Sequence, residues 1–392
     1  LLDHLRESFE LHFWLHGHDL GPIARYLHAC IGWGLDPHGA IDALAGASPS
    51  TARPMTRLRR LREILETSGR QVTTLDELRL VSEEAAQLVD DHLAEHGQVL
   101  ATGYDITSYT LGELSDAVLN SVRSALPDPG MDHEAVAAGL RDAVPADARS
   151  DFDTYLSDAR AVMDMRDDNG PLTVEWPVGL LRRSLLHAGA RMQRRGALVI
   201  ADHALELTPD EARQLFAGGI PSAAEIARRA ERRVHLATLD PPLTLGDPEV
   251  QPPLDVLPKV LADTVAMVQV SMEHMGMDGV AAVDPLAGVG IGPSTYVGRA
   301  RVAASADDAF DKLEPGDVLV VRATSPAFNA VLAIAGAVVT ADGGALSHAA
   351  VIARELGITA VIGAAGALSS IGDGSIVEVD PVAGSVRVVS PR

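Results

Sequence analysis

One histidine of the chain stands between a glycine pair and an apolar helix, in the stretch TADGGALSHAAVIARELGITAVIGA at residues 340–364. The run GAVVT predicts a buried strand that ends at Thr340, ADGGAL predicts a tight turn, and Ser347 suits the N-cap of a helix ending near Leu356. His348 then lies in the first helical turn, where free backbone N–H groups and the helix dipole favour an anion. A phosphoryl group on the imidazole would be stabilised there.

A phosphohistidine site needs one ring nitrogen free to attack and the other held by a hydrogen-bond partner, which sets the tautomer. Thr340 or a nearby carbonyl is expected to supply that partner. Gly343 and Gly344 let the backbone approach a phosphate without a Cβ clash. Arg354, on the same helix, either meets the charge of the phosphate or pairs with a carboxylate. A histidine that only packs in a core would explain neither the glycine pair nor the serine cap.

This stretch resembles the phosphohistidine signature of the swivelling domain in the PEP-utilising enzyme family, which includes pyruvate phosphate dikinase, phosphoenolpyruvate synthase and rifampicin phosphotransferase. The flanking runs GIGPSTYVGRARV and LEPGDVLVVRATSPAF also resemble that domain, the second one through Thr324, Pro326 and Phe328. Thr359 stands where the family usually has proline. The positions that match the signature are Thr340, Gly343, Gly344, Ser347, His348, Ala349, Ala350, Ala353, Arg354, Gly357, Ile358, Ala360, Val361 and Gly363.

The resemblance implies that His348 accepts a phosphoryl group, with Thr340 and Ser347 in the catalytic site and Gly343, Gly344 and Arg354 on the phosphate. It also implies ATP or PEP with Mg²⁺ in an ATP-grasp domain. Residues 1–258 contain no lysine, no P-loop and little strand pattern, whereas an ATP-grasp domain needs fixed cations, a glycine-rich loop and several strands. The nucleotide step is therefore expected on a partner subunit or a missing segment, and no cofactor or metal is expected in this chain. The chain opens on Leu1 rather than Met, so residues upstream are expected to have been removed or never seen.

The elements that must position His348 fall into two parts. Residues 1–275 show mostly helical periodicity, with a Pro-rich link at about 240–257. After a linker at 276–288, residues 289–392 alternate short β-branched runs with a helix and form a β/β/α module of domain size. The expected fold is a large α-helical substrate-binding domain followed by a C-terminal phosphohistidine-type swivelling domain.

The helical part resembles, more weakly, the helical substrate domain of rifampicin phosphotransferase-like proteins. The segment that follows His96 lacks the arginine expected there, which puts any inherited substrate in doubt. The stretch LHFWLHGHDL gathers three histidines, two of them four residues apart, but neither a zinc-protease glutamate nor a third ligand is evident, so no metal site is predicted. Packing or capping is the alternative role of each candidate for the substrate pocket: His12, His16, His18, Tyr104, Asp105, Glu113, Arg166 and Asp168.

The composition excludes some partners. A formal net charge of −22 repels nucleic acid and anionic membrane surfaces. No apolar run reaches the roughly 18 residues of a membrane span, and no signal peptide opens the sequence. The lone Cys30 cannot form an internal disulfide, which fits a reducing compartment. We therefore expect a cytoplasmic protein whose partners are a small-molecule substrate and possibly an ATP-grasp subunit, with neither nucleic acid nor membrane among them.

Three functions follow, in order of preference. The first is a phosphotransferase component that carries a phosphoryl group on His348 to a small molecule held in the helical domain. The second is an ATP-independent lyase or dehydratase of natural-product metabolism that reuses His348 as a general acid or base. The third is a non-catalytic binding module.

Overall fold

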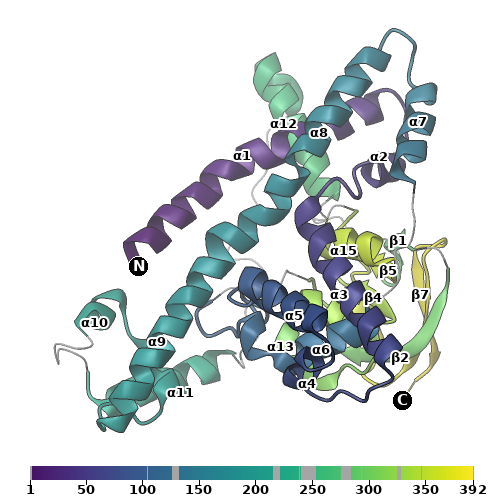
Figure 1. Ribbon diagram of the computed structural model, residues 1–392. Coiled ribbons are helices and arrows are strands. Elements are labelled where there is room, and N and C mark those ends of the chain that lie inside the picture. Colours follow the sequence, from purple (N-terminus) through teal and green to yellow (C-terminus); the bar gives the residue numbers. More distant parts are fainter. Residues whose placement is uncertain are drawn as a thin grey trace.

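The computed structural model describes residues 2–103, 105–125, 132–214, 221–237, 239, 253–274, 284–292, 294–324, 328–345 and 347–391. The described residues up to 274 are mainly helical, and those from residue 289 onward form a sheet with short helices (Figure 1). The expected order of a large helical part and a C-terminal α/β module is confirmed. Tyr104, residues 240–252 of the expected Pro-rich link and residues 276–283 of the expected linker lie outside the described residues. Residues 284–288 already pack on the module, where the Gly288 N–H donates to Gly384 O at 2.8 Å.

The helices of the first part, with η marking 3₁₀ and π segments, are α1 (Leu2–Gly32), α2 (Pro37–Asp42), α3 (Pro49–Ser68), α4 (Leu75–Arg79), α5 (Glu83–His96), η1 (Leu111–Glu113), α6 (Ser115–Ser124), α7 (His133–Ala143), α8 (Arg149–Gly170), η2 (Pro171–Glu175), α9 (Trp176–Arg194), η3 (Ala201–Glu206), α10 (Pro209–Gln214), α11 (Ala223–Ala237), η4 (Leu254–Val256) and α12 (Lys259–His274). Several of them begin at residues of the capping type. Thr208 and Glu211, for example, form a capping box at α10, in which each side chain accepts a hydrogen bond from the backbone N–H of the other residue.

A long rod made of α8, η2 and α9 crosses the helical part, and α1 lies along α8 (Figure 1). Tyr26 and Leu27 of α1 are fully buried against Phe152 of α8 in the main helical core. Pro171 interrupts the rod because proline has no N–H to donate to the preceding turn. The chain passes this point as one π turn, in which the Trp176 N–H donates to Pro171 O, and then continues as α9.

The second part is a seven-stranded sheet with the order β1-β5-β4-β3-β2-β6-β7. The four central strands, β2 to β5, pair in parallel, and β1, β6 and β7 extend the two sides as antiparallel strands. Every residue of β3, β4 and β5 is buried, as expected for parallel strands with both faces covered. The strands are β1 (Val289–Ile291), β2 (Tyr296–Val302), β3 (Val318–Val321), β4 (Ala337–Thr340), β5 (Thr359–Ile362), β6 (Ile376–Asp380) and β7 (Ser385–Ser390).

Helices cover both faces of this sheet. One face packs on α13 (Ala306–Lys312), α14 (Asn329–Leu332) and α15 (His348–Leu356), and the other on α16 (Ala367–Ser370).

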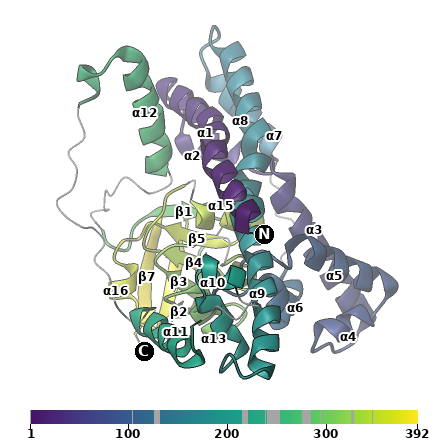
Figure 2. The ribbon, with the colours of Figure 1, turned by 90° about the vertical axis from the view of Figure 1, so that its left-hand side faces the viewer.

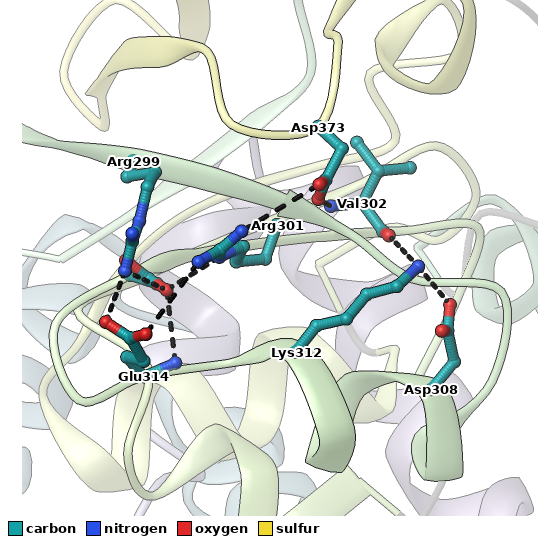
Figure 3. A network of polar contacts seen from close by, with 8 residues as sticks. Arg299, Arg301, Val302, Asp308, Lys312, Glu314 and Asp373 are labelled. Carbon is teal, nitrogen blue, oxygen red and sulfur yellow. Dashed lines mark hydrogen bonds and ion pairs between the residues drawn. The ribbon is translucent and has the colours of Figure 1, made fainter.

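Charged side chains fasten β2 to the segment that precedes β3. Arg299 and Arg301 of β2 both contact the Asp317 carboxylate at 3.0 Å, and Arg299 also reaches Glu314. Lys312 donates to Val302 O and to Asp308 in the same region (Figure 3). Asp317 is 5 % exposed, so it needs these partners. The network therefore fixes the start of β3, which leads toward the site.

The C-terminal module is docked on the helical part. Ala345 joins the helical core around α1, α2 and α8, and Met55 of α3 packs against the core of the module. The Arg354 guanidinium donates to the Asp42 carboxylate at 2.8 Å and to Ala345 O at 2.6 Å. These contacts dock the module, with α15, beside the helical part (Figures 1 and 2).

Candidate functional site

A cavity of about 940 Å³ lies between the helical part and the C-terminal module. This volume suits a drug-sized organic molecule. Helices α1, α3, α5 and the α8–η2–α9 rod form one side, and the turns after β3 and β4 with the start of α15 form the other. The side chains that line it include His348, Ser347, Thr324, Arg166, Asp168 and Glu175.

His348 faces this cavity from the first residue of α15, as the sequence predicts. Its Nδ1 lies 2.9 Å from the Thr324 hydroxyl, and its buried Nε2 has no hydrogen-bond partner among the residues that the structure describes. Burial, and then the positive charge of Arg166, lower the pKa of His348 to about 3. The ring is therefore neutral near pH 7, and in the tautomer with the proton on Nδ1 it donates to Thr324 and leaves the Nε2 lone pair free.

The turn before His348 depends on a glycine. Gly343 has φ +115°, and a Cβ added there would lie 3.0 Å from Ser347 Oγ and 3.1 Å from its Cβ. Ser347 occupies the N-cap of α15, but its hydroxyl makes no capping hydrogen bond and is buried without a partner. Two polar groups, Ser347 Oγ and His348 Nε2, are thus left unpaired at the same cavity wall. Such groups cost free energy unless a ligand pairs with them.

Two residues of the expected site have other partners. Thr340 is fully buried, and its hydroxyl accepts from the Gly363 N–H at 3.3 Å, so the hydroxyl beside the histidine ring is that of Thr324. Arg354 pairs with Asp42, the second of the two roles considered for it. Gly344 is buried in the turn, where its carbonyl accepts from the Ser347 N–H at 3.0 Å. Binding of a phosphate by Gly343, Gly344 and Arg354 stays a prediction.

An acidic wall near the middle of the rod, where α8 ends and η2 begins, faces the cavity. It consists of Asp167, Asp168 and Glu175, with Arg166 beside them. Burial raises the pKa of both aspartates, and burial alone raises that of Glu175 to about 8. Glu175 is 1 % exposed, and neither carboxyl oxygen has a hydrogen-bond partner in the described part of the chain. Two of the predicted pocket residues, Arg166 and Asp168, therefore lie at the cavity together with an acid that the sequence reasoning missed.

The three candidate histidines of α1, His12, His16 and His18, have different surroundings. His12 contacts Asn169 and Thr173 through Nδ1, at 3.1 and 3.0 Å, and its Nε2 lies 3.1 Å from that of His16. His16 lines the cavity, whereas His18 is exposed and stacks near Trp14.

Asp105 and Glu113 hold loops. The Asp105 carboxylate accepts from the N–H and hydroxyl of Thr107 in an exposed turn. Glu113 forms a two-bond ion pair with Arg182 at 2.9 and 3.0 Å and closes a capping box with Thr110. Burial opposes ionisation of Glu113, but Arg182 and Thr110 outweigh it and lower its pKa. Neither acid is among the residues that line the cavity.

Glu175 could have been identified from the sequence as a candidate buried acid. It is the lone carboxylate in the mostly apolar run LTVEWPVGLL. His92 and His96, four residues apart on α5, are further cavity residues outside the predicted set. Burial, and then His96, lower the pKa of His92 to about 3.

The arrangement defines a docked phosphohistidine-type module over a substrate-sized cavity. Residues 313–384 match the family model described as PEP-utilising enzyme, mobile domain. This match within the C-terminal module confirms the resemblance found in the sequence.

Proteins from several other organisms are similar to this chain over part of their own length. An uncharacterized protein of Mycobacterium tuberculosis is 32% identical over 212 residues, 54% of this chain and 22% of that protein. An uncharacterized phosphotransferase of Bacillus subtilis is 28% identical over 280 residues, 71% of this chain and 30% of that protein. The phosphoenolpyruvate synthase of Aeropyrum pernix is 43% identical over 99 residues, 25% of this chain and 12% of the synthase. The chain thus matches less than a third of the length of each.

Among the described residues, no helix combines the length and apolar character needed to cross a membrane. The same residues contain no group of three or more His, Cys, Asp or Glu side chains arranged to hold a metal ion.

Proposed function

We propose that the chain is a phosphotransferase component in which Nε2 of His348 accepts a phosphoryl group and passes it to a small molecule bound in the cavity. The observation that carries this proposal is the buried Nε2 of a cavity-lining histidine, which has no partner among the described residues, on a neutral ring whose Nδ1 is held by Thr324. A nucleophile of this kind needs a free lone pair and a fixed tautomer. The match to the mobile domain of PEP-utilising enzymes supports the same chemistry.

The surroundings of Nε2 fit a phosphoryl group. The N-terminal N–H groups of α15 and the unpaired Ser347 hydroxyl offer hydrogen bonds to its oxygens. Arg166, which lowers the pKa of His348 through its charge, would compensate the negative charge of the transferred group. The phosphoryl donor is proposed to be ATP or PEP, bound with Mg²⁺ by an ATP-grasp partner or segment, in the cytoplasm.

The lyase alternative requires His348 to act as a general acid or base. A ring whose pKa is about 3 holds no proton to donate near pH 7 and is a weak base. In the neutral ring the Nε2 lone pair carries no proton, which is the state that nucleophilic attack requires.

Intact-mass analysis tests the carrier directly. The purified chain is treated with phosphoramidate, a small phosphoryl donor that needs no partner, and in parallel with ATP or PEP and Mg²⁺. We expect an acid-labile gain of about 80 Da, the mass of one phosphoryl group, that is lost in His348→Ala. Absence of the adduct with every donor would refute the carrier and leave the lyase or a non-catalytic binding module.

A further inference from the structure

Glu175 is a buried acid that the carrier chemistry above does not use. It is 1 % exposed, it lies in the π turn of the rod, and both of its carboxyl oxygens lack partners while the residue lines the cavity. Its Oε1 lies beside Gly170, 3.7 Å from the position that a Cβ would occupy there, which is an ordinary contact distance. A buried, unpaired carboxyl group lowers stability. Groups of this kind concentrate at functional sites.

From this geometry we propose that Glu175 takes the proton of the acceptor hydroxyl when the phosphoryl group leaves His348, and that the acceptor is an alcohol on a mostly apolar molecule. This inference rests on the proposed carrier function of His348.

The bonds, the proton and the electron pair of the transfer are all accounted for by groups at the site. The acceptor O–H bond breaks and its proton passes to a Glu175 carboxylate oxygen, while the acceptor oxygen forms the new P–O bond. The P–Nε2 bond breaks and its electron pair returns to Nε2. The ring is left neutral with its proton on Nδ1, where it donates to Thr324. Glu175 then releases its proton to solvent.

The acidity of Glu175 suits this step. Burial raises its pKa to about 8, and a general base works best when its pKa lies near the working pH. The carboxylate of a stronger acid would hold the proton too weakly to assist the attack.

The lining of the cavity indicates the class of acceptor. Apolar side chains from four helices and a loop contribute much of it, among them Leu20, Met55, Leu58, Val99, Leu100 and Trp176. A carboxylate acceptor would have to enter beside Asp167 and Asp168, and like charges repel strongly where water is scarce. An alcohol meets no such repulsion and carries the proton that Glu175 would receive.

The test follows the phosphorylated chain after phosphoramidate loading. Water is itself a hydroxyl acceptor, so loss of the acid-labile phosphoryl group in buffer reports transfer without a known substrate. Wild type, Glu175→Gln and Glu175→Asp are loaded equally and then timed by intact mass. We expect at least about 100-fold slower loss in Glu175→Gln and an intermediate rate in Glu175→Asp, as for removal or displacement of a general base. Glu231→Gln, on the exposed face of α11, controls for the loss of one negative charge.

Two further experiments distinguish a general base from a structural residue at position 175. Formate is added to loaded Glu175→Ala, where the vacated space admits a small carboxylate, and should restore much of the rate. Benzyl alcohol and benzoate are offered to the loaded wild type, and only the alcohol should yield a phosphate ester by ³¹P NMR.

Three outcomes would each overturn a different part of the proposal. Equal rates of loss in loaded wild type and Glu175→Gln would overturn the role of Glu175 while leaving the carrier intact. Failure of wild type to load would overturn the carrier, and this inference with it. No benzyl phosphate, despite Glu175-dependent loss to water, would overturn the apolar alcohol as the acceptor class.

Discussion

Replacing Glu175 by Gln should stabilise the folded protein, and the gain should grow with pH. Glutamine has nearly the shape of a protonated glutamate but does not ionise. The pKa of Glu175 rises from 4.5 to about 8 on folding because the side chain is buried. Between these two values the unfolded chain gives up the proton and the folded chain keeps it. The stability that the protonated Glu175 side chain gives the wild type is therefore fully present below pH 4.5. The unfolding free energy of the wild type then falls as the pH rises toward 8.

The size of the effect follows from linkage. Each pH unit between the two pKa values costs the wild type about 1.4 kcal/mol of unfolding free energy. Since pH 7 lies 2.5 units above the ordinary value of 4.5, the accumulated loss there is about 3 kcal/mol. The glutamine variant escapes this loss. Any fixed cost of placing an amide in the cavity shifts its whole curve and leaves the slope unchanged.

Urea unfolding at pH 5, 6, 7 and 8 measures the two slopes. All three tryptophans lie in the helical part, one of them directly after Glu175, so their fluorescence reports the unfolding of the elements that bury the carboxyl. Glu231→Gln is the control for a changed net charge. Parallel curves for wild type and Glu175→Gln would show that the carboxyl ionises alike in both states, and the reasoning from burial would then be wrong.

Three further predictions concern the module and its docking. Thr324→Val should slow phosphorylation of His348 about 10- to 100-fold because Nδ1 loses its partner, whereas Thr324→Ser should keep most of the rate in a loading time course by intact mass. Gly343→Ala should cost about 1 to 3 kcal/mol of stability, seen in urea titration, because alanine is strained at φ +115°; unchanged stability would contradict the need for glycine in this turn. Arg354→Met and Asp42→Asn should each destabilise the chain, and their double-mutant cycle should give a coupling of about 1 to 2 kcal/mol; strictly additive effects would mean that the ion pair contributes nothing to docking.

The local part of the site could be predicted from the sequence. The glycine turn, the cap at Ser347 and the histidine in the first turn of α15 depend on residues within a few positions of one another, and the structure has them in that arrangement. The order of a helical part and an α/β module also follows from periodicity, because the hydrophobic repeat differs between helices and strands.

The partners of those residues could not be predicted, because they depend on strand order and docking. Thr324 follows β3 and His348 follows β4, and they meet because these strands are parallel neighbours whose carboxyl ends share one edge of the sheet. The sequence does not state that order, so the nearer Thr340 was the natural choice. Arg354 finds Asp42, which is 312 residues away in the chain, only when the module docks on α2.

The π turn at Pro171–Glu175 makes the composition of the cavity depend on the length of the chain. A π turn is a helix that accommodates one added residue. Deleting one residue there would remove the added residue of the π turn and rotate one side of the junction by about 100° relative to the other. Arg166 and Asp168 before the turn and Glu175 after it could then no longer face the same space. An insertion or deletion of a single residue in this rod would therefore change which charged side chains face the cavity.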